Sequence, residues 1–368
     1  MKAFFHVQHL LGIGHLKRAA TLAGALAREG FEVTLASGGM PVAGIVPAGV
    51  KLAQLPPAAS EDASFKHLVD ERGRRVDDAW RERRKIRLLE TYEAIDPELL
   101  LIELFPFGRR QFAFELLPLL ERARDHSSIA CSVRDIIQDK PSRHEEMLAL
   151  AERYFDLVLV HGDARMAAFP LAAPLRGKLR YTGYVVEEPA TNASGDGRGE
   201  VIVSAGGGSV GRILLETAIA ARPLSVLRER TWRILTGVNG SDLASLAGSN
   251  LIVESFRADF RTLLANCELS ISQAGYNTVM ETLQARARAV LVPFAAGGES
   301  EQSARARLLA ERGLAEVVEE TELDPVTLAA AVDRAARRER PPAGAVDLGG
   351  AARSVALLNG LLGGKRYA

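Results

Sequence analysis

The alternation of apolar and helical stretches at the start of the chain leaves few folds open. AFFHV at 3–7 and FEVTLAS at 31–37 are short apolar runs of the kind that form buried strands. Between them, residues 15–29 are rich in Ala and Leu and stop at Gly30, which predicts a helix. Two strands joined by a crossover helix pair in parallel. The loop at 10–14 then lies at the carboxyl end of the first strand, where open α/β sheets bind ligands.

The same alternation continues along the chain and divides it into two halves. Apolar runs that read as strands follow at 99–104, 129–133 and 157–162, and then at 201–207, 232–237, 251–255, 269–272 and 289–294. A length of 368 residues fits two domains of common size. The polar stretch EEPATNASGDGRGE separates the two sets of strands. We therefore predict an α/β domain over 1–186, a linker over 187–200, a second α/β domain over 201–349, and a final helix over 350–368 that can pack back on the first domain.

Composition excludes several classes of function. The 46 basic and 46 acidic side chains cancel, so no global field attracts nucleic acid. Cys131 and Cys267 are far apart in sequence, which favours a reducing, cytoplasmic setting without a cysteine metal site. We expect no signal peptide and no transmembrane segment. The arginine-rich segment 71–87 is either a solvated helix or loop, or a contact surface for an anionic acceptor or a membrane.

The first glycine loop, Gly12-Ile13-Gly14, is followed directly by His15. A dinucleotide-binding fingerprint would need a glycine where the chain has Lys17, and no acidic residue ends the strand at 31–37, which disfavours an NAD-dependent oxidoreductase. A small loop that presents an imidazole at a helix N-terminus keeps that ring neutral, because the helix dipole disfavours the imidazolium. His15 is therefore either a general base that works near pH 7 or a residue that caps the helix.

Two glycine turns in the second half are candidate anion sites. VSAGGGSVG at 203–211 lies between a strand and a helix, so its backbone N–H groups can approach a diphosphate, although it lacks the Lys-Ser/Thr ending of a P-loop. In SQAGYNTVMETL the turn at Gly275 precedes a helix that we expect to begin at Asn277 or Thr278. Glu281 then lies one turn further on the same face, and it either accepts the hydroxyls of a ribose or forms a capping box with Thr278.

A third strand-end loop, over 293–306, carries Glu301 and Gln302 at the head of a helix. A carboxylate and an amide suit the hydroxyls of a sugar, and an exposed polar helix start is the alternative. In the first half, Arg134 and Asp135 follow the strand at 129–133 and are secondary candidates for contact with an acceptor.

These segments together resemble family-28 glycosyltransferases. The similarity lies in VSAGGGS, in SFRADFRTLLANCELSISQAGYNTVMETL and in VPFAAGGESEQSARARLLAERGLAEVV, which look like the carboxyl-terminal domain of that family, including its lipid II-forming N-acetylglucosaminyltransferase. GIGHLKRAATLAGALAREGFEVT is similar to the family's amino-terminal loop. ELFPFGRRQFAFELLPLL at 103–120 resembles a group of bacterial predicted glycosyltransferases. The resemblance covers about 1–37 and 200–320.

The resemblance implies a GT-B fold of two doubly wound α/β domains that face a central cleft, with the acceptor mainly on the first and the nucleotide sugar on the second. It implies that the backbone around Phe256 and Arg257 meets the uracil and that Glu281 meets the ribose. The remaining implied donor contacts are to the diphosphate and phosphate (Gly206, Gly207, Gly208, Ser209, Gly275, Asn277 and Thr278) and to the sugar (Glu301 and Gln302). His15 would be the base, with Gly12, Gly14, Arg134 and Asp135 on the acceptor side.

We therefore expect a metal-independent, inverting hexosyltransferase that uses a UDP-sugar as donor substrate and has no resident cofactor. The acceptor is a hydroxyl compound whose identity is open, with anionic and lipid-linked alcohols among the options, and peripheral contact with a membrane is open as well. The alternatives are a nucleotide-sugar epimerase or hydrolase on the same fold, and a non-catalytic nucleotide-sugar sensor.

Overall fold

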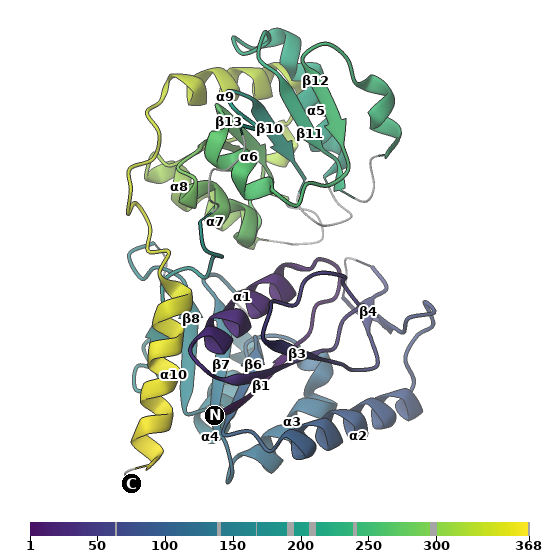
Figure 1. Cartoon of the computed structure of the whole chain (residues 1–368), viewed down its shortest axis with the longest axis vertical. Coiled ribbons are helices and arrows are strands. Elements are labelled where there is room, and N and C mark those ends of the chain that lie inside the picture. The colour runs from purple at the N-terminus through teal and green to yellow at the C-terminus, as the bar shows by residue number, and fades with distance from the viewer. Residues whose placement is uncertain are drawn as a thin grey trace. The chain divides into compact units, whose positions relative to one another are not determined.

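The computed structural model describes residues 1–62, 65–137, 141–166, 168–189, 195–205, 211–237, 241–294 and 300–366. The chain divides into two compact units (Figure 1). Unit 1 comprises Met1–Val186 and Gly349–Ala368, and unit 2 comprises Glu187–Leu348. Each unit contains a parallel sheet covered by helices, so the predicted α/β class with two doubly wound sheets is confirmed.

The sheet of unit 1 has seven strands in the order β3-β2-β1-β6-β7-β8-β9, and every neighbouring pair is parallel. The order reverses between β1 and β6, the kind of position at which open α/β sheets bind ligands. The strands are β1 (Lys2–Val7), β2 (Glu32–Ser37), β3 (Val50–Gln54), β6 (Leu99–Glu103), β7 (Ser128–Arg134), β8 (Leu157–His161) and β9 (Leu179–Tyr181). A short antiparallel pair, β4 (Ala59–Ser60) and β5 (Leu68–Val69), stands outside this sheet.

Helices cover both faces of this sheet. On one face α1 (Gly14–Arg28) and α10 (Gly350–Arg366) bury their leucines in a common apolar cluster. On the other face lie α2 (Asp78–Ile95), α3 (Ala113–Ala123) and α4 (His144–Tyr154). Helix α10 therefore belongs to unit 1, although it follows unit 2 in the sequence (Figure 1). Short 3₁₀ turns precede α3 and α4 at Arg110–Phe112 and Pro141–Arg143.

The sheet of unit 2 has six parallel strands in the order β12-β11-β10-β13-β14-β15. The strands are β10 (Val201–Ser204), β11 (Trp232–Leu235), β12 (Leu251–Glu254), β13 (Leu269–Ser272), β14 (Arg288–Leu291) and β15 (Glu316–Val317). The helices are α5 (Arg212–Ala221), α6 (Phe260–Asn266), α7 (Tyr276–Gln284), α8 (Glu301–Glu311) and α9 (Pro325–Arg337), with 3₁₀ turns at Arg222–Leu224, Ser241–Leu246 and Glu320–Glu322. Side chains of α5 and α9 share one apolar cluster with the strands.

Several boundaries differ from the sequence-based expectation. The helix expected to begin at Asn277 or Thr278 begins at Tyr276 instead, because Gly275 has an extended backbone and acts as the N-cap. Strand β14 stops at Leu291, before the Pro293 that cannot donate to a ladder. The described residues of the expected linker belong to unit 2, where Asp196 pairs with Arg257. Within the described ranges, no helix has the length and hydropathy needed to span a membrane.

Candidate functional site

His15 lies in the first turn of α1, as expected, but it does not cap that helix. The helix begins at Gly14, and its N-cap is Ile13, with no hydrogen bond from a side chain to the cap. No acidic residue occupies the first turn, so the partial positive charge of the helix end faces the ring without a neutralising carboxylate on the same helix. The capping interpretation of His15 is therefore wrong.

A buried carboxylate holds the His15 ring. Nδ1 of His15 lies 3.0 Å from Oε1 of Glu103, the last residue of β6. The His15 side chain is 12% exposed and that of Glu103 is 0% exposed. Arg18, one turn further along α1, also donates through Nη2 to Glu103 Oε1. The carboxylate thus accepts from a histidine and an arginine on the same helix.

The charges around this pair keep the carboxyl ionised and the imidazole neutral. Burial alone would raise the pKa of Glu103, but the Arg18 guanidinium and the hydrogen bond from His15 hold it well below its usual range. Burial lowers the pKa of His15 well below its ordinary value, and the Arg109 guanidinium lowers it further, against the raising effect of Glu103. His15 is therefore an unprotonated ring next to an anion at neutral pH, as a general base requires.

Sequence reasoning missed Glu103 and the polar residues behind it. Ser132 on β7 donates to Glu103 Oε2 at 2.6 Å, and His161 on β8 lies with Nε2 2.9 Å from the same Ser132 hydroxyl. Thr182 Oγ1 lies 2.9 Å from Nδ1 of His161. The available signal was a polar residue at or near the end of each of three apolar strands, in LLLIE, SIACSVR and LVLVH. Adjacent parallel strands bring such positions together at one edge of the sheet.

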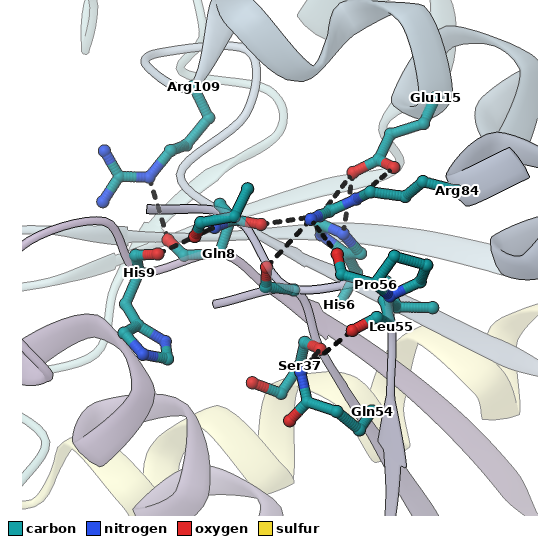
Figure 2. Close-up of polar contacts among 12 residues, drawn as sticks. His6, Gln8, His9, Ser37, Gln54, Leu55, Pro56, Arg84, Arg109 and Glu115 are labelled. Atoms are coloured by element: carbon teal, nitrogen blue, oxygen red, sulfur yellow. Dashed lines mark hydrogen bonds and ion pairs between the residues drawn. The ribbon is translucent and has the colours of Figure 1, made fainter. Parts of the chain in front are cut away.

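A second network of buried hydrogen bonds and ion pairs holds Gln8, at the start of the loop that leads to His15 (Figure 2). Arg84 on α2 forms a two-pronged ion pair with Glu115 on α3, at 2.7 and 2.8 Å, and neither side chain is exposed. The same guanidinium donates to Gln8 Oε1 at 2.6 Å and to the carbonyls of Gly38 and Pro56 at 2.8 Å each. All five donors of one arginine are thereby directed at fixed acceptors, which ties the residue after β1 to α2 and α3.

Arg109 fixes the loop from its other side (Figure 2). Its Nε donates to the carbonyl oxygen of Gln8 at 2.9 Å, and its backbone has a φ of 57°. The Gln8 side chain itself donates to the carbonyl of Ala58 at 3.0 Å. His9 follows in the loop and is buried against Gly39, where any Cβ would collide with the imidazole ring. The side chains of Arg109, Gln8 and His9 therefore hold this loop in its conformation.

The acceptor-side candidates lie close to these elements within unit 1. Gly12 is exposed, and a Cβ there would meet no atom within 4 Å. Gly14 is the first residue of α1, and Arg134 is the last residue of β7. Asp135 is buried, with Gly162 packed so closely on it that a Cβ at 162 would lie 2.8 Å from the Asp135 Cβ.

In unit 2, the glycine loop lies outside the described residues, and with it Gly206, Gly207, Gly208 and Ser209. The second predicted anion site, at the start of α7, is described. Asn277 and Thr278 occupy the first turn and are half-buried, while Glu281 is 4% exposed. Because the helix begins at Tyr276, Thr278 lies inside it and cannot be an N-cap, so the capping-box interpretation of Thr278 and Glu281 is wrong.

The Arg257 side chain is occupied by carboxylates. It donates to Asp259 at 2.8 and 2.7 Å and to Asp196 at 2.8 Å, and these contacts raise its pKa. Phe256 is 77% exposed. Any contact of this segment with a base would therefore come from its backbone, as the resemblance implied, or from the Phe256 ring.

Glu301 and Gln302 begin α8, as expected. Glu301 is buried, and Gln302 accepts from the backbone N–H of Phe294 at 3.2 Å. Arg305, one turn later, donates to the carbonyl of Ala274 at 3.0 Å and lies over the Tyr276 ring, which joins α8 to the start of α7. Within the described ranges, no group of three or more His, Cys, Asp or Glu side chains could hold a metal ion.

Comparison with known proteins finds a family match in the second half of the chain. Residues 202–344 match the model of the glycosyltransferase family 28 C-terminal domain. A UDP-N-acetylglucosamine--N-acetylmuramyl-(pentapeptide) pyrophosphoryl-undecaprenol N-acetylglucosamine transferase of Phenylobacterium zucineum is 32% identical over 54% of this chain and 53% of its own length. The transferase of the same name from Synechococcus sp. strain CC9605 is 26% identical over 57% of this chain and 60% of its own. The chain thus aligns with little more than half the length of these relatives.

Solved structures extend the likeness to the whole fold. The calicheamicin glycosyltransferase CalG4 covers 98% of each chain with a TM-score of 0.67 and 18% identity. MurG of Acinetobacter baumannii covers 98% of this chain and 100% of its own, with a TM-score of 0.59 and 16% identity. At such identities the likeness establishes the fold, which is GT-B.

Proposed function

We propose that this chain, a family-28-like protein with a GT-B fold, is a glycosyltransferase that moves a hexose from a UDP-sugar to a hydroxyl acceptor with inversion at the anomeric carbon. The family domain in residues 202–344 favours sugar transfer over the epimerase, hydrolase and sensor alternatives. The observation within the chain that carries the proposal is the pairing of His15 with the buried Glu103.

This pairing supports a complete transfer step. The acceptor oxygen would form a bond to the anomeric carbon while the bond from that carbon to the diphosphate oxygen breaks, and the electron pair leaves with UDP. The acceptor proton would go to Nε2 of His15, because Nδ1 is engaged with Glu103. The Glu103 carboxylate would stabilise the imidazolium that forms, as a buried acid does in other histidine-based catalysts.

Unit 2 would bind the donor. The start of α7, with Gly275, Asn277 and Thr278, offers backbone N–H groups and a helix end to a phosphate, and Glu281 lies one turn further for the ribose. Glu301 and Gln302 would meet the sugar, and the backbone at Phe256 and Arg257 the uracil. Backbone donors of this kind can stabilise a leaving diphosphate without a divalent metal, so we propose metal-independent transfer.

The acceptor would bind to unit 1 near Gly12, Gly14, Arg134 and Asp135. The names of the curated relatives describe transfer to a pyrophosphoryl-undecaprenol compound, so an anionic, lipid-linked alcohol is a reasonable class to test first. Such an acceptor would place the protein at the cytoplasmic side of a membrane, in peripheral contact with it.

A donor screen tests this proposal. Thermal unfolding is measured with a panel of UDP-sugars and dTDP-sugars, since a ligand stabilises the folded state by an amount set by its affinity. Release of the nucleoside diphosphate is then followed for the best donor, with and without candidate acceptors, and with EDTA or added magnesium. We expect UDP-sugars to stabilise most, release to require an acceptor, and EDTA to have no effect.

Each other outcome would indicate a different activity, a different donor or a dependence on metal. Acceptor-independent release of UDP indicates a hydrolase, and interconversion of two UDP-sugars an epimerase. Binding without turnover against any acceptor indicates a sensor. Stabilisation by dTDP-sugars alone contradicts the proposed donor, and activity that EDTA removes and magnesium restores contradicts metal-independent transfer.

A further inference from the structure

We propose that His161 is a positioning residue for His15: acting through Ser132 and Glu103, it holds the catalytic ring in the tautomer that carries its proton on Nδ1. The inference rests on the proposed function, because it concerns the same base. It assigns a role to a buried histidine that does not touch the acceptor or the donor.

The first step concerns the groups that donate hydrogen bonds to the Glu103 carboxylate. An ionised carboxylate can only accept hydrogen bonds. Its Oε1 lies 3.0 Å from Nδ1 of His15 and also accepts from Arg18 Nη2. Arg18 Nη2 has two N–H groups, one of which donates to the carboxylate, and it also lies 3.3 Å from the same His15 Nδ1. The shorter contact at Nδ1 is the one of 3.0 Å to the anionic Glu103. A lone pair on Nδ1 would face the carboxylate oxygen, so the Nδ1–H form of His15 is the one that this contact favours.

The second step concerns the single proton of Ser132. Its hydroxyl donates to Glu103 Oε2 at 2.6 Å, a bond to a charged acceptor and therefore stronger than a bond between neutral groups. That proton is then no longer available for His161. The contact of 2.9 Å between Ser132 Oγ and Nε2 of His161 must be donated by the ring. His161 is thereby assigned the Nε2–H tautomer.

The third step concerns the far side of His161. Its Nδ1 lies 2.9 Å from Thr182 Oγ1. The Thr182 hydroxyl has another acceptor, the carbonyl of Gly183 at 2.7 Å, so Thr182 is compatible with either tautomer of His161. Burial lowers the pKa of His161 to about 3, which leaves one proton on its ring at neutral pH. The choice between the two tautomers is therefore made at the Glu103 end, by the charge-assisted bond.

The hydrogen bonds that link Thr182, His161, Ser132 and Glu103 can consequently be donated in two alternative directions. In one, every donor points toward Glu103: Thr182 to His161, His161 to Ser132, and Ser132 to the carboxylate. In the other, His161 carries its proton on Nδ1, the Ser132 hydroxyl turns toward His161, and Oε2 of Glu103 loses its donor. Only the first direction supplies donors to both oxygens of Glu103 and keeps that carboxylate oriented toward His15.

Nitrogen-15 NMR of histidine-labelled full-length protein tests this inference without any assay of activity. Long-range proton–nitrogen correlations distinguish the two tautomers of a neutral histidine. We expect Nδ1–H for His15 and Nε2–H for His161 in the wild-type protein. An Nδ1–H signal for His161 would overturn the proposal, whether or not the protein transfers a sugar.

Variants then test whether His161 acts on His15. We expect His161→Leu and Ser132→Ala to give mixed tautomers at His15, and His161→Gln, which keeps an N–H donor, to restore the single tautomer. Ser127→Ala is a matched control, since Ser127 is another buried serine of unit 1 and hydrogen bonds to Tyr92. If transfer is established, kcat should fall about 10-fold to 100-fold in the first two variants, by analogy with the loss when a residue that orients a metal ligand is removed. UDP affinity should be unchanged.

A single Nδ1–H tautomer of His15 in both His161→Leu and Ser132→Ala would make His161 a packing residue only. If His161→Leu does not fold, Ser132→Ala and His161→Gln still test the proposal. An unaltered tautomer of His15 in Ser132→Ala would contradict an effect of His161 through Ser132 and Glu103. Failure of the proposed function alone would appear as the expected tautomers without sugar transfer.

Discussion

Glu103 and His15 meet across unit 1, 88 positions apart in sequence, with 3.0 Å between Oε1 and Nδ1. The contact joins the end of β6 to the start of α1. It pairs a carboxylate with 0% exposure to a ring that is 12% exposed. A buried acid in this position would fix the orientation and tautomer of the proposed base, whose ring still reaches the surface.

Glu103→Gln tests the role of this carboxylate. The amide keeps the shape but can present an N–H to Nδ1, which would favour the opposite tautomer of His15. We expect kcat to fall about 10²-fold to 10⁴-fold, the upper value being the loss in a serine protease when an amide replaces the acid that orients its histidine. Calorimetry should give an unchanged affinity for UDP. Near-normal turnover in a folded Glu103→Gln protein would show that the Glu103 carboxylate contributes to stability alone and not to turnover.

The buried His161 should make stability depend on pH. In the unfolded chain the ring takes up a proton below about pH 6.5, whereas in the folded protein its pKa is about 3, because burial disfavours the charged form. Glu103 and Arg18 are the charged groups that act on it, in opposite directions. The stabilisation is complete above pH 6.5 and is lost as the pH falls toward 3, by up to about 1.4 kcal/mol per pH unit.

Urea unfolding of the wild type and of His161→Gln between pH 5 and pH 7 measures the contribution of His161 to the pH dependence of stability. Most carboxyl groups titrate below this pH range. The free energy of unfolding of the variant should depend less steeply on pH. His15 contributes with the same sign and remains in both proteins. Parallel pH profiles for the two proteins would rule out a neutral buried His161 in the folded state.

The fold is more predictable from the sequence than the site. Most central strands were found because strands buried on both faces are continuous apolar runs, as in LLLIE of β6. Strand β3 was missed because it lies at the sheet edge, where Lys51 and Leu52 are exposed and the apolar run is broken. The two-residue strands β4 and β5 are too short to give a pattern.

The site escaped prediction for a related reason. His15 stood out because it follows two glycines, a local signal. Glu103, Ser132 and His161 come together only when β6, β7 and β8 pair side by side in parallel. No single segment of the sequence reveals the register of these pairings. Arg84 is a further example: among the many arginines of 71–87, nothing marks it as the one with no exposed surface.

Arg84 and Glu115 should be a major determinant of the stability of unit 1. Arg84→Met leaves a fully buried carboxylate without its partner, and breaking such pairs typically costs about 3–5 kcal/mol. Arg122→Met is the matched control, because Arg122 pairs with Glu93 at 3.0 Å on the surface, where such pairs contribute less than about 1 kcal/mol. Urea unfolding compares the two. Equal losses would mean that the buried pair of Arg84 and Glu115 stabilises the protein no more than the surface pair of Arg122 and Glu93 does.

Glu281 should contribute to binding of UDP. If its carboxylate accepts the ribose hydroxyls, Glu281→Ala weakens UDP by about 1–3 kcal/mol, the range for hydrogen bonds to a charged group. Glu311→Ala provides the control, since Glu311 is an exposed glutamate at the end of α8 in the same unit. Calorimetric titration with UDP gives both values. Unchanged affinity in Glu281→Ala would remove Glu281 from the donor site.

The pH dependence of kcat/KM in the wild type and in His15→Ala is the most direct test of our proposal that His15 is the general base. The wild-type profile should lose activity only well below pH 6.5, because burial and Arg109 lower the pKa of His15. In His15→Ala that acidic limb should disappear, kcat should fall about 10²-fold to 10⁴-fold, and UDP affinity should stay the same. His126→Ala, at an exposed histidine of unit 1, should behave as the wild type. A His15→Ala protein that is folded, binds UDP and retains near-normal kcat with an unchanged acidic limb would contradict the assignment of His15 as the base.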